Sequence, residues 1–453
     1  NVLYHANNLF WSVARQPRYN LKLEDYARPR ETAGRVSKII LSGDHLQLPP
    51  VPASSSLLAS LDGTSDEHKA GAAMFANIEQ VFVLETMMRF RDTVLKKILE
   101  KMRTLGGTTL SDEEWQALMD TNVNLDRSNA RVTEQFLNKT ADWYHGCYLW
   151  SVITLSAYTC AKLSAKKARC TLFYVQAIDV PKVKPRHGPA DESGNLPRET
   201  VTLYQRMLQV ANLSSTKRLP GWTYFHQGMR VRLTGTVLAP WAVQDSTGFI
   251  QFMTLHPTDA EALNSCVSPP AEYKLAYPPI LSIKLDKEER EFLPPTPCGA
   301  HRDAGHANEC PDCTTYPGIV QVKYLTVAWH YSESAAGYNS SVQRMQLPIM
   351  PEKACPLYGL QGTTADPGLI AHWAMPARGS RDIKWLIVYV MLSRVRGLDC
   401  LASFGLNDKI REIIESGPPE ELIGTFERLF GEKAKNTRIA ASNARRLLGW
   451  PSP

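Results

Sequence analysis

The stretch GDHLQLPPV, at residues 43–51, follows an apolar run at residues 36–41 that ends in the letters KIIL. A short apolar run bounded by turn residues predicts a buried strand of a parallel sheet. Gly, Asp and Pro commonly end strands, so a plain turn is one interpretation of the exit. The other is a ligand site, because open α/β sheets bind ligands just beyond the carboxyl ends of their strands. The nine residues alone leave both interpretations open.

Composition narrows the class of protein. The chain has 453 residues, of which 43% are hydrophobic, which is enough for roughly two to four domains. A net charge of +6 permits a polyanionic partner without requiring one, and nine cysteines favour a reducing, intracellular compartment. No stretch approaches the ~20 apolar residues of a membrane span, so we expect no membrane partner. The start NVLYHANNLF is neither a signal peptide nor an initiating Met, which favours a fragment.

Alternating strand-like and helical patterns over residues 36–180 are typical of an α/β domain. Ser111 and Glu114 have the spacing of a capping box that opens a helix. One face of the predicted helix 93–107 is apolar, through Val94, Leu95, Ile98, Leu99 and Met102. We expect a helix at 151–170, strands at 81–84, 171–180, 229–237 and 385–392, long loops over 256–317, and three amphipathic helices that close the chain.

Three further motifs carry chemistry-bearing side chains. LETMMRFRD, residues 84–92, contains Arg89, and LYGLQGTTADPG, residues 357–368, contains a Gln-Gly-Thr-Thr turn. YVMLSRVRGLDCL, residues 389–401, places Arg394 directly after a predicted strand. Each motif is weak alone, because an Arg after a strand is usually a solvated side chain.

Together and in this order, the four motifs resemble those of superfamily 1 DNA helicases of the RecD and PIF (petite integration frequency) type. The family pattern is a strand with GDxxQLPPV, then an Arg, QGxT and YVALSR. The similarity extends from about residue 36 to 406, and GMRVRLTG, residues 228–235, resembles the strand that opens a barrel-like insertion in the family. The resemblance implies an α/β fold with RecA-like parallel-sheet lobes, the first one incomplete here, a small β-barrel-like insertion and a zinc loop.

On this resemblance we expect five segments. They are a C-terminal remnant of the first RecA-like lobe (1–92), linker helices with the start of the second lobe (93–180), an inserted β-rich subdomain with a Cys/His loop (181–330), the motor motifs of the second lobe (331–406) and C-terminal helices (407–453).

The resemblance also implies a mechanism, in which ATP and Mg lie between the lobes and hydrolysis moves single-stranded DNA in the 5′-to-3′ direction. Asp44 and Gln47 would sense the γ-phosphate and the attacking water. Arg394 would be the finger on the transferred phosphate, where a planar guanidinium suits the spread of charge; alternatively, it only caps the end of its strand. The other implied nucleotide contacts are Arg89, Gln361 and Gly362, and the implied DNA contacts are Pro49, Pro50, Thr363 and Thr364.

Departures from the family pattern are equally informative. A phosphate loop of the form G-x-x-x-x-G-K-[ST] is absent, since no Gly-Lys dipeptide occurs in these 453 residues. The Asp-Glu pair that holds Mg should precede residue 43, where only Glu24-Asp25 occurs, in loop-like sequence. We therefore expect a missing N-terminal lobe of the same polypeptide, and no ATP hydrolysis by this chain alone. Where the family has His-Lys-Ser before QG, residues 358–360 are Tyr-Gly-Leu.

CGAHRDAGHANECPDC, residues 298–313, lies outside the motor signature. Cys-x-x-His followed by Cys-x-x-Cys has the spacing of a structural, tetrahedral zinc site. The predicted ligands are Cys298, His301, Cys310 and Cys313, with His306 as the alternative histidine. The other interpretation is a polar loop that holds these residues by chance.

Basic stretches at residues 162–170, 181–187 and 432–446 suit a phosphate track, although helical Lys and Arg more often form a solvated face. Trp143, Trp222 and Trp329 suit base stacking, although core packing is the more common role.

Two functions follow. The first is an ATP-dependent DNA helicase acting on single-stranded DNA and duplex junctions, with roles in DNA repair, recombination or telomere maintenance, in the nucleus if the source is eukaryotic. The second is a non-catalytic, zinc-stabilised nucleic-acid-binding remnant of a helicase.

Overall fold

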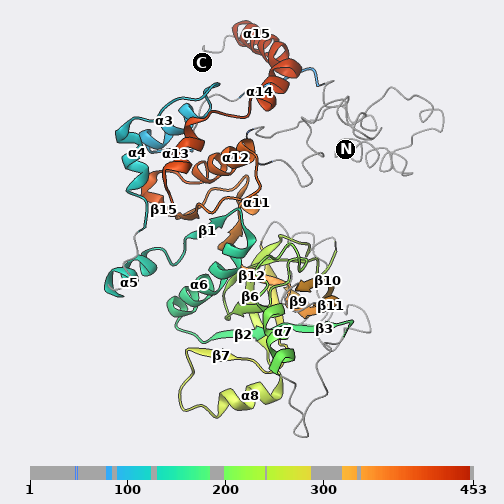
Figure 1. Ribbon diagram of the computed structural model, residues 1–453. Helices are drawn as coiled ribbons and strands as arrows, with labels where there is room; N and C mark the ends of the chain where they lie inside the picture. The colour runs from blue at the N-terminus through green and yellow to red at the C-terminus, as the bar shows by residue number, and fades with distance from the viewer. Residues whose placement is uncertain are drawn as a thin grey trace, which may run out of the picture. The chain divides into compact units, whose positions relative to one another are not determined.

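A computed structural model describes residues 46, 48, 78–83, 89–123, 130–183, 198–239, 242–286, 319–333 and 338–448 (Figure 1). The chain divides into two compact units. Unit 1 comprises 1–116, 378–396 and 407–453, and unit 2 comprises 117–377 and 397–406.

The regular elements in the described residues of unit 1 are all helices. Its helices are α3 (Thr93–Met102), the start of α4 (Asp112–Met119), α12 (Arg381–Leu392), α13 (Asp408–Glu415), α14 (Glu420–Phe426), a π-helical turn (Glu427–Gly431) and α15 (Glu432–Leu447). The helices α3, α12 and α13 pack against one another (Figure 1). The three predicted closing helices are confirmed.

Local signals at α3 and α4 are confirmed by their contacts. Asp92 caps α3, since its Oδ1 accepts from the backbone N–H of Val94 at 2.8 Å and of Leu95 at 3.2 Å. The capping box is reciprocal: Glu114 N–H donates to Ser111 Oγ at 3.2 Å, and Ser111 N–H donates to Glu114 Oε2 at 2.8 Å. The predicted apolar face of α3 is buried at Leu95, Ile98, Leu99 and Met102.

The predicted strand at residues 385–392 is wrong, because this segment lies within helix α12. Ser380 caps the helix with its Oγ accepting from Ile383 N–H at 3.3 Å. Every residue from Trp385 to Leu392 is buried, and a helix buried all round shows the same unbroken apolar run as a buried strand. Residues 81–83, predicted as part of a strand, have no regular structure.

Unit 2 contains a four-stranded parallel sheet in the order β13-β1-β14-β15. Its strands are β1 (Tyr144–Cys147), β13 (Ala354–Pro356), β14 (Leu369–His372) and β15 (Leu401–Phe404). The helix α6 (Trp150–Ala168), predicted at 151–170, packs on β1 and β13. The neighbours β1 and β13 are far apart in the chain, so residues 148–353 form an insertion between adjacent strands of one sheet.

Antiparallel strands dominate this insertion. A five-stranded sheet has the order β12-β5-β6-β8-β9, with β5 (Arg230–Leu233) at the predicted position. Its other strands are β6 (Thr247–Thr254), β8 (Ile280–Leu285), β9 (Ile319–Val322) and β12 (Ile349–Pro351). Two three-stranded sheets contain β2 (Leu172–Gln176), β3 (Ile178–Pro181), β4 (Trp222–Phe225), β7 (Glu272–Lys274), β10 (Leu325–Glu333) and β11 (Tyr338–Gln346).

Among the described residues of unit 2, the other α-helices are α5 (Ala130–Lys139), α7 (Arg198–Leu208), α8 (Pro257–Asn264) and the single turn α11 (Leu357–Leu360), and a 3₁₀ turn spans Leu398–Cys400. The helix α8 and strands β7 and β8 occupy part of 256–317, so the predicted long loops are wrong up to residue 285; residues 287–318 lie outside the described residues. No helix in the described ranges is long and apolar enough to cross a membrane.

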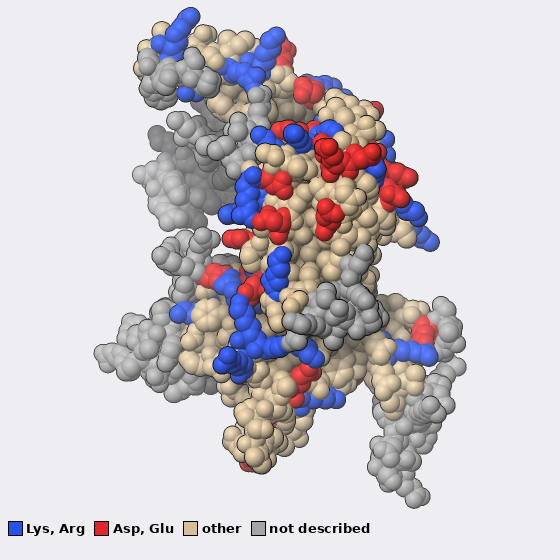
Figure 2. All heavy atoms as spheres, turned by 90° about the vertical axis from the view of Figure 1, so that its left-hand side faces the viewer, with Lys and Arg blue, Asp and Glu red and all other residues tan. Residues whose placement is uncertain are grey.

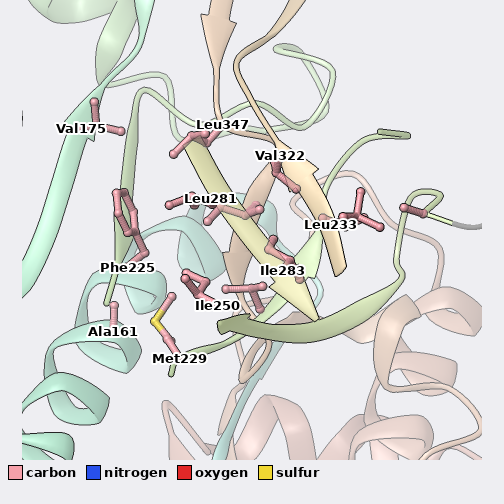
Figure 3. Packing of buried hydrophobic residues seen from close by; sticks show 14 of the residues in the cluster. Ala161, Val175, Phe225, Met229, Leu233, Ile250, Leu281, Ile283, Val322 and Leu347 are labelled. Atoms are coloured by element: carbon pink, nitrogen blue, oxygen red, sulfur yellow. The ribbon is translucent and has the colours of Figure 1, made fainter. Parts of the chain in front are cut away.

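The core of the insertion is continuous with α6. Phe225, Ile250 and Leu281 converge with Ala161 of α6 in one buried cluster (Figure 3). Burying one large apolar side chain contributes about 1.5–3 kcal/mol to the free energy of folding. The shared burial in this cluster therefore holds the antiparallel strands against α6, the helix that follows β1.

A buried ion pair lies beside a second buried cluster of the insertion, which includes Met207 and Trp329. Arg344 on β11 donates twice to Asp179 on β3, at 2.8 and 2.7 Å, and both side chains are at most 1% exposed. The guanidinium also donates to backbone carbonyls of Met207 and Leu219, and its carbon lies 4.8 Å from the ring centroid of Trp329. A fully satisfied buried arginine of this kind ties the end of α7 to two strands.

Candidate functional site

Several predicted site residues lie outside the described residues. They are Asp44, Gln47, Pro49 and Pro50 of the opening motif and Cys298, His301, His306, Cys310 and Cys313 of the zinc loop. Within the described ranges, no group of three or more His, Cys, Asp or Glu side chains could hold a metal ion. The zinc site stays a prediction, as do the roles of Asp44 and Gln47.

Two predicted arginines meet at one residue of unit 1, Ser393, which follows the last turn of α12. Arg89 Nη1 donates to the Ser393 carbonyl at 2.8 Å. Arg394 Nη2 donates to Ser393 Oγ at 2.7 Å, and its Nε donates to the Val390 carbonyl at 3.1 Å. Arg89 is exposed, whereas Arg394 is only 2% exposed. The structure therefore joins residues 304 positions apart in the sequence.

The chain segments on either side of this link also run together. Arg91 N–H donates to the Arg396 carbonyl at 2.9 Å, and both of these arginines are exposed. Four arginines therefore lie on two short segments, 89–91 and 394–396, that are hydrogen-bonded to each other. Guanidinium groups remain charged at all physiological pH values and match phosphate oxygens in a fork geometry. The arrangement is suited to binding a polyanion.

Neighbouring helices hold this arginine cluster in place. Arg103, just after α3, donates from Nε to the hydroxyl of Tyr389 on α12 at 2.8 Å, and its guanidinium carbon lies 5.4 Å from that ring centroid. The Tyr389 ring stacks on Trp385, with centroids 5.0 Å apart and an interplanar angle of 8°. Because Asp92 caps α3 directly after Arg91, the position of the 89–91 segment is tied to the α3–α12 contact.

The Gln-Gly-Thr-Thr turn lies in unit 2, directly after α11. Gly362 has a φ of +77°, and a Cβ there would meet no atom within 4 Å, so the backbone is open on that side. Thr363 Oγ1 donates back to the Leu360 carbonyl at 3.0 Å. The turn thus needs glycine for its conformation and leaves the Gly362 backbone accessible to a ligand. Thr364, predicted with Thr363 as a DNA contact, is half-buried.

The sequence analysis missed an aromatic pair that includes Tyr358 of α11, the helix before this turn, and a cation–π contact two residues after the other ring. Tyr148 follows β1 and Tyr358 lies on α11 after β13, and their ring centroids are 6.1 Å apart. Arg218 lies over the ring of Trp150, with 5.7 Å between guanidinium carbon and centroid. All four side chains are half-buried. The letters YLW, residues 148–150 directly after β1, are a signal for Tyr148 and Trp150, but only where residues 144–147 are predicted to be a strand.

The tryptophans singled out in the sequence are mainly core residues. Trp143 and Trp329 are 7% and 5% exposed, which leaves no ring face for a base and confirms the packing interpretation for both. Trp222 is half-buried, and Lys274 Nζ lies 5.2 Å from its ring centroid.

A buried histidine and a half-buried one lie side by side in the parallel sheet. His145 on β1 and His372 on β14 have ring centroids 5.9 Å apart, and His372 also stacks on Phe404 of β15. Burial and the neighbouring His372 lower the pKa of His145 to about 3, and burial also lowers the pKa of His372. Both rings are therefore neutral at physiological pH.

Basic stretches of the chain are partly neutralised. Lys162 pairs with Glu272 at 2.7 Å, which raises the pKa of its ammonium group, and Lys167 pairs with Asp142. Figure 2 shows Lys and Arg side chains interspersed with Asp and Glu side chains on the face in view. This mixed charge favours the solvated-face interpretation for the lysines of 162–170.

No protein-family model and no curated protein matches this chain. Solved structures that align with it include the Pif1 helicase from Candida albicans, at 14% identity over 86% of this chain and 67% of that one, with a TM-score of 0.44. Bacteroides Pif1 bound to ssDNA aligns at 13% identity over 95% and 72%, with a TM-score of 0.45. Pif1 helicase from Bacteroides in complex with ADP-AlF3 and ssDNA aligns at 13% identity over 86% and 66%, with a TM-score of 0.40.

The chain thus spans about two thirds of the length of these proteins. Identities of 13–14% with TM-scores below 0.5 assign no activity to this chain. Functional assignments have to rest on its own residues and contacts.

Proposed function

We propose that this chain is part of an ATP-dependent DNA helicase motor that moves on single-stranded DNA in the 5′-to-3′ direction. The observation that carries the proposal is the link from Arg89 through Ser393 to Arg394, because it gathers the two arginines whose motifs predict contact with a transferred phosphate. Phosphoryl transfer depends mainly on positioned cations, and guanidinium groups suit its spread of charge.

In this proposal the exposed Arg89 and the arginines at 91 and 396 attract the polyphosphate, while Arg394 is the finger. Arg394 follows α12 and is only 2% exposed, and fixed acceptors for its Nε and Nη2 hold the guanidinium in one orientation. Asp44 and Gln47 would act on the attacking water. An Asp-Glu pair would hold the Mg ion, but the pair that the family pattern has before residue 43 does not occur in these 453 residues. Zinc at Cys298, His301, Cys310 and Cys313 would be structural.

Single-stranded DNA is the proposed track, with the Gly362 turn contacting its backbone. A second candidate is a non-catalytic nucleic-acid-binding remnant, which is favoured by the lack of any Gly-Lys dipeptide in these residues. Both candidates bind DNA, so they differ only in ATP turnover.

Fluorescence anisotropy with a labelled oligo-dT strand tests the shared part of both candidates. We expect binding that weakens as salt rises, with a log–log slope of about −0.7 for each phosphate contacted. A duplex of the same length without single-stranded ends serves as the comparison and should bind more weakly. Absence of binding at low salt would contradict both candidates.

A further inference from the structure

The carboxyl ends of β1 and β13 carry an aromatic pair in unit 2. Tyr148 is the first residue after β1, and Tyr358 lies in the turn α11 that directly follows β13. Since the two strands are parallel neighbours, both residues leave the sheet at the same edge. Their rings are 6.1 Å apart between centroids and tilted by 43°. The pair is half-buried, unlike the fully buried aromatic side chains of the core.

Two arginines lie near the chain segments that carry this pair. Arg218 lies over Trp150, two residues after Tyr148, and also donates to Asp245 at 3.3 Å. Arg232 Nη1 lies 3.8 Å from the same carboxylate of Asp245. A Cβ on Gly359, the neighbour of Tyr358, would lie 3.4 Å from Arg232 Nη1. Two guanidinium groups therefore share the Asp245 carboxylate, and that of Arg232 lies beside the backbone next to Tyr358.

One of these groups has unused hydrogen-bonding capacity. The Nε of Arg232 is buried and has no hydrogen-bond partner among the described residues. The Gly362 turn that follows α11 has an open backbone. Aromatic faces, a positive charge and an open backbone turn thus lie at one edge of the sheet, where open α/β sheets bind their ligands.

We propose that Tyr148 and Tyr358 form a stacking platform for the bases of single-stranded nucleic acid, with Arg218 and Arg232 as its cationic support. This inference rests on the proposed function, from which it takes nucleic acid as the class of ligand. Sequence-independent binding of single strands combines aromatic side chains that stack on bases with positive charge along the backbone. The arginines here are partly neutralised by Asp245, so stacking rather than charge supplies most of the contact.

The hydroxyl of Tyr358 does not change this role with pH in the physiological range. Burial and the nearby Tyr148 raise the pKa of Tyr358 to about 12. The ring therefore stays neutral and presents an uncharged face to a base.

The experiment compares an oligo-dT strand of ~15 nucleotides with an abasic strand of the same length and the same phosphates. The wild-type chain should bind oligo-dT more tightly than the abasic strand. Tyr358→Leu and Tyr148→Leu should each weaken oligo-dT binding by about 5- to 100-fold and leave abasic binding unchanged, because stacking on one aromatic ring accounts for a difference of this size. Phe at either position should restore the wild-type affinity.

Tyr277→Ala is the matched control, since Tyr277 is 44% exposed and stacks on His256 elsewhere in unit 2. It should leave both affinities unchanged. Thermal melting of every variant shows whether it is folded. The comparison of oligo-dT with the abasic strand uses the wild-type chain, so it does not depend on the folding of a variant. Wild-type binding that is equal on both strands would overturn the platform and leave the proposed function intact. Wild-type binding to neither strand would overturn both. Folded Leu variants that bind oligo-dT normally would also overturn the platform.

Discussion

The arginine cluster of unit 1 and the sheet edge of unit 2 are built from different chemistry. At the end of α12, the residues brought together are arginines, and Arg89 contacts Ser393 through its guanidinium. At the ends of β1 and β13, the residues brought together are Tyr148 and Tyr358, and the arginines nearby share Asp245. The first region suits phosphate groups and the second suits bases. The positive charge of the first region and the aromatic rings of the second thus come from separate parts of the chain.

The two regions also differ in how they are held. Arg394 is fixed by hydrogen bonds to the end of a helix, to Val390 and Ser393. Tyr148 and Tyr358 are placed by a parallel sheet whose strands β1 and β13 pair directly. Changes at Arg394 should therefore act on phosphate chemistry, whereas changes in the sheet should act on stability and DNA binding.

The largest effect is expected from Arg394→Ala in a longer chain that carries a phosphate loop. ATP turnover should fall by roughly 10³- to 10⁵-fold, the range for arginine fingers, while affinity for single-stranded DNA stays nearly normal. Lys should restore little activity, because a point charge does not reproduce the guanidinium fork. Steady-state phosphate release and anisotropy on the same preparations measure the two effects.

Arg396→Ala is the control, since Arg396 is exposed and its contact with Arg91 is through the backbone. Its effect on turnover should be milder. If Arg394 only closes the end of α12, its removal would lower the melting temperature and leave turnover per folded molecule intact. A destabilised but fully active Arg394→Ala variant would thus remove the finger assignment.

Acid should weaken the sheet region through His145. The folded pKa of His145 is about 3, below the ordinary value of about 6.5 in an unfolded chain. Below pH 6.5 the unfolded state binds a proton that the folded state does not, so stability is complete above that pH and is lost as pH falls toward 3. The loss from this group is up to about 1.4 kcal/mol per pH unit. Urea unfolding between pH 7 and pH 4 measures it.

His145→Phe should flatten this acid dependence, because the ring stays and the titrating group is removed. His330→Phe is the control, since His330 on β10 is exposed. An acid dependence that is the same in His145→Phe and the wild type would show that another group causes the loss.

The smallest effects are expected from two Gly→Ala substitutions that should change the free energy of unfolding in opposite directions. Gly362→Ala should lower the free energy of unfolding by roughly 1–2 kcal/mol, because a side chain at a φ of +77° is strained even in open space. Gly424→Ala, inside α14 of unit 1 and also in open space, should raise it by roughly 0.5–1 kcal/mol. Denaturant titrations compare the two, and stabilisation by Gly362→Ala would contradict the described turn.

Sequence patterns predicted the elements that depend on contacts between residues close together in the chain. Capping by Ser111 and Glu114, the apolar face of α3 and the helix α6 could all be predicted because residues three or four apart determine them. The helix α12 was mistaken for a strand since its run of eight buried residues, 385–392, has no polar face to reveal a period.

The features that the sequence did not predict depend on pairing between residues far apart in the chain. Strand β1 has the letters YHGC, which show no strand pattern, and it forms because β13 and β14 flank it on both sides. The pair Tyr148–Tyr358 depends on that pairing and was missed with it. The motifs single out Arg89 and Arg394, whose roles stay predictions, whereas the position of Ser393 between them depends on a helix end where the sequence predicts a strand.

The most direct test of the proposed motor is ATP turnover with and without single-stranded DNA. Residues 1–453 alone should release no phosphate above background, because they contain no Gly-Lys dipeptide for a phosphate loop. The same residues joined to an N-terminal segment with a phosphate loop and an Asp-Glu strand should hydrolyse ATP and be stimulated by single-stranded DNA. Folded, extended protein that binds ATP but shows no DNA-stimulated turnover would contradict the proposed motor, as would robust DNA-dependent turnover by residues 1–453 alone.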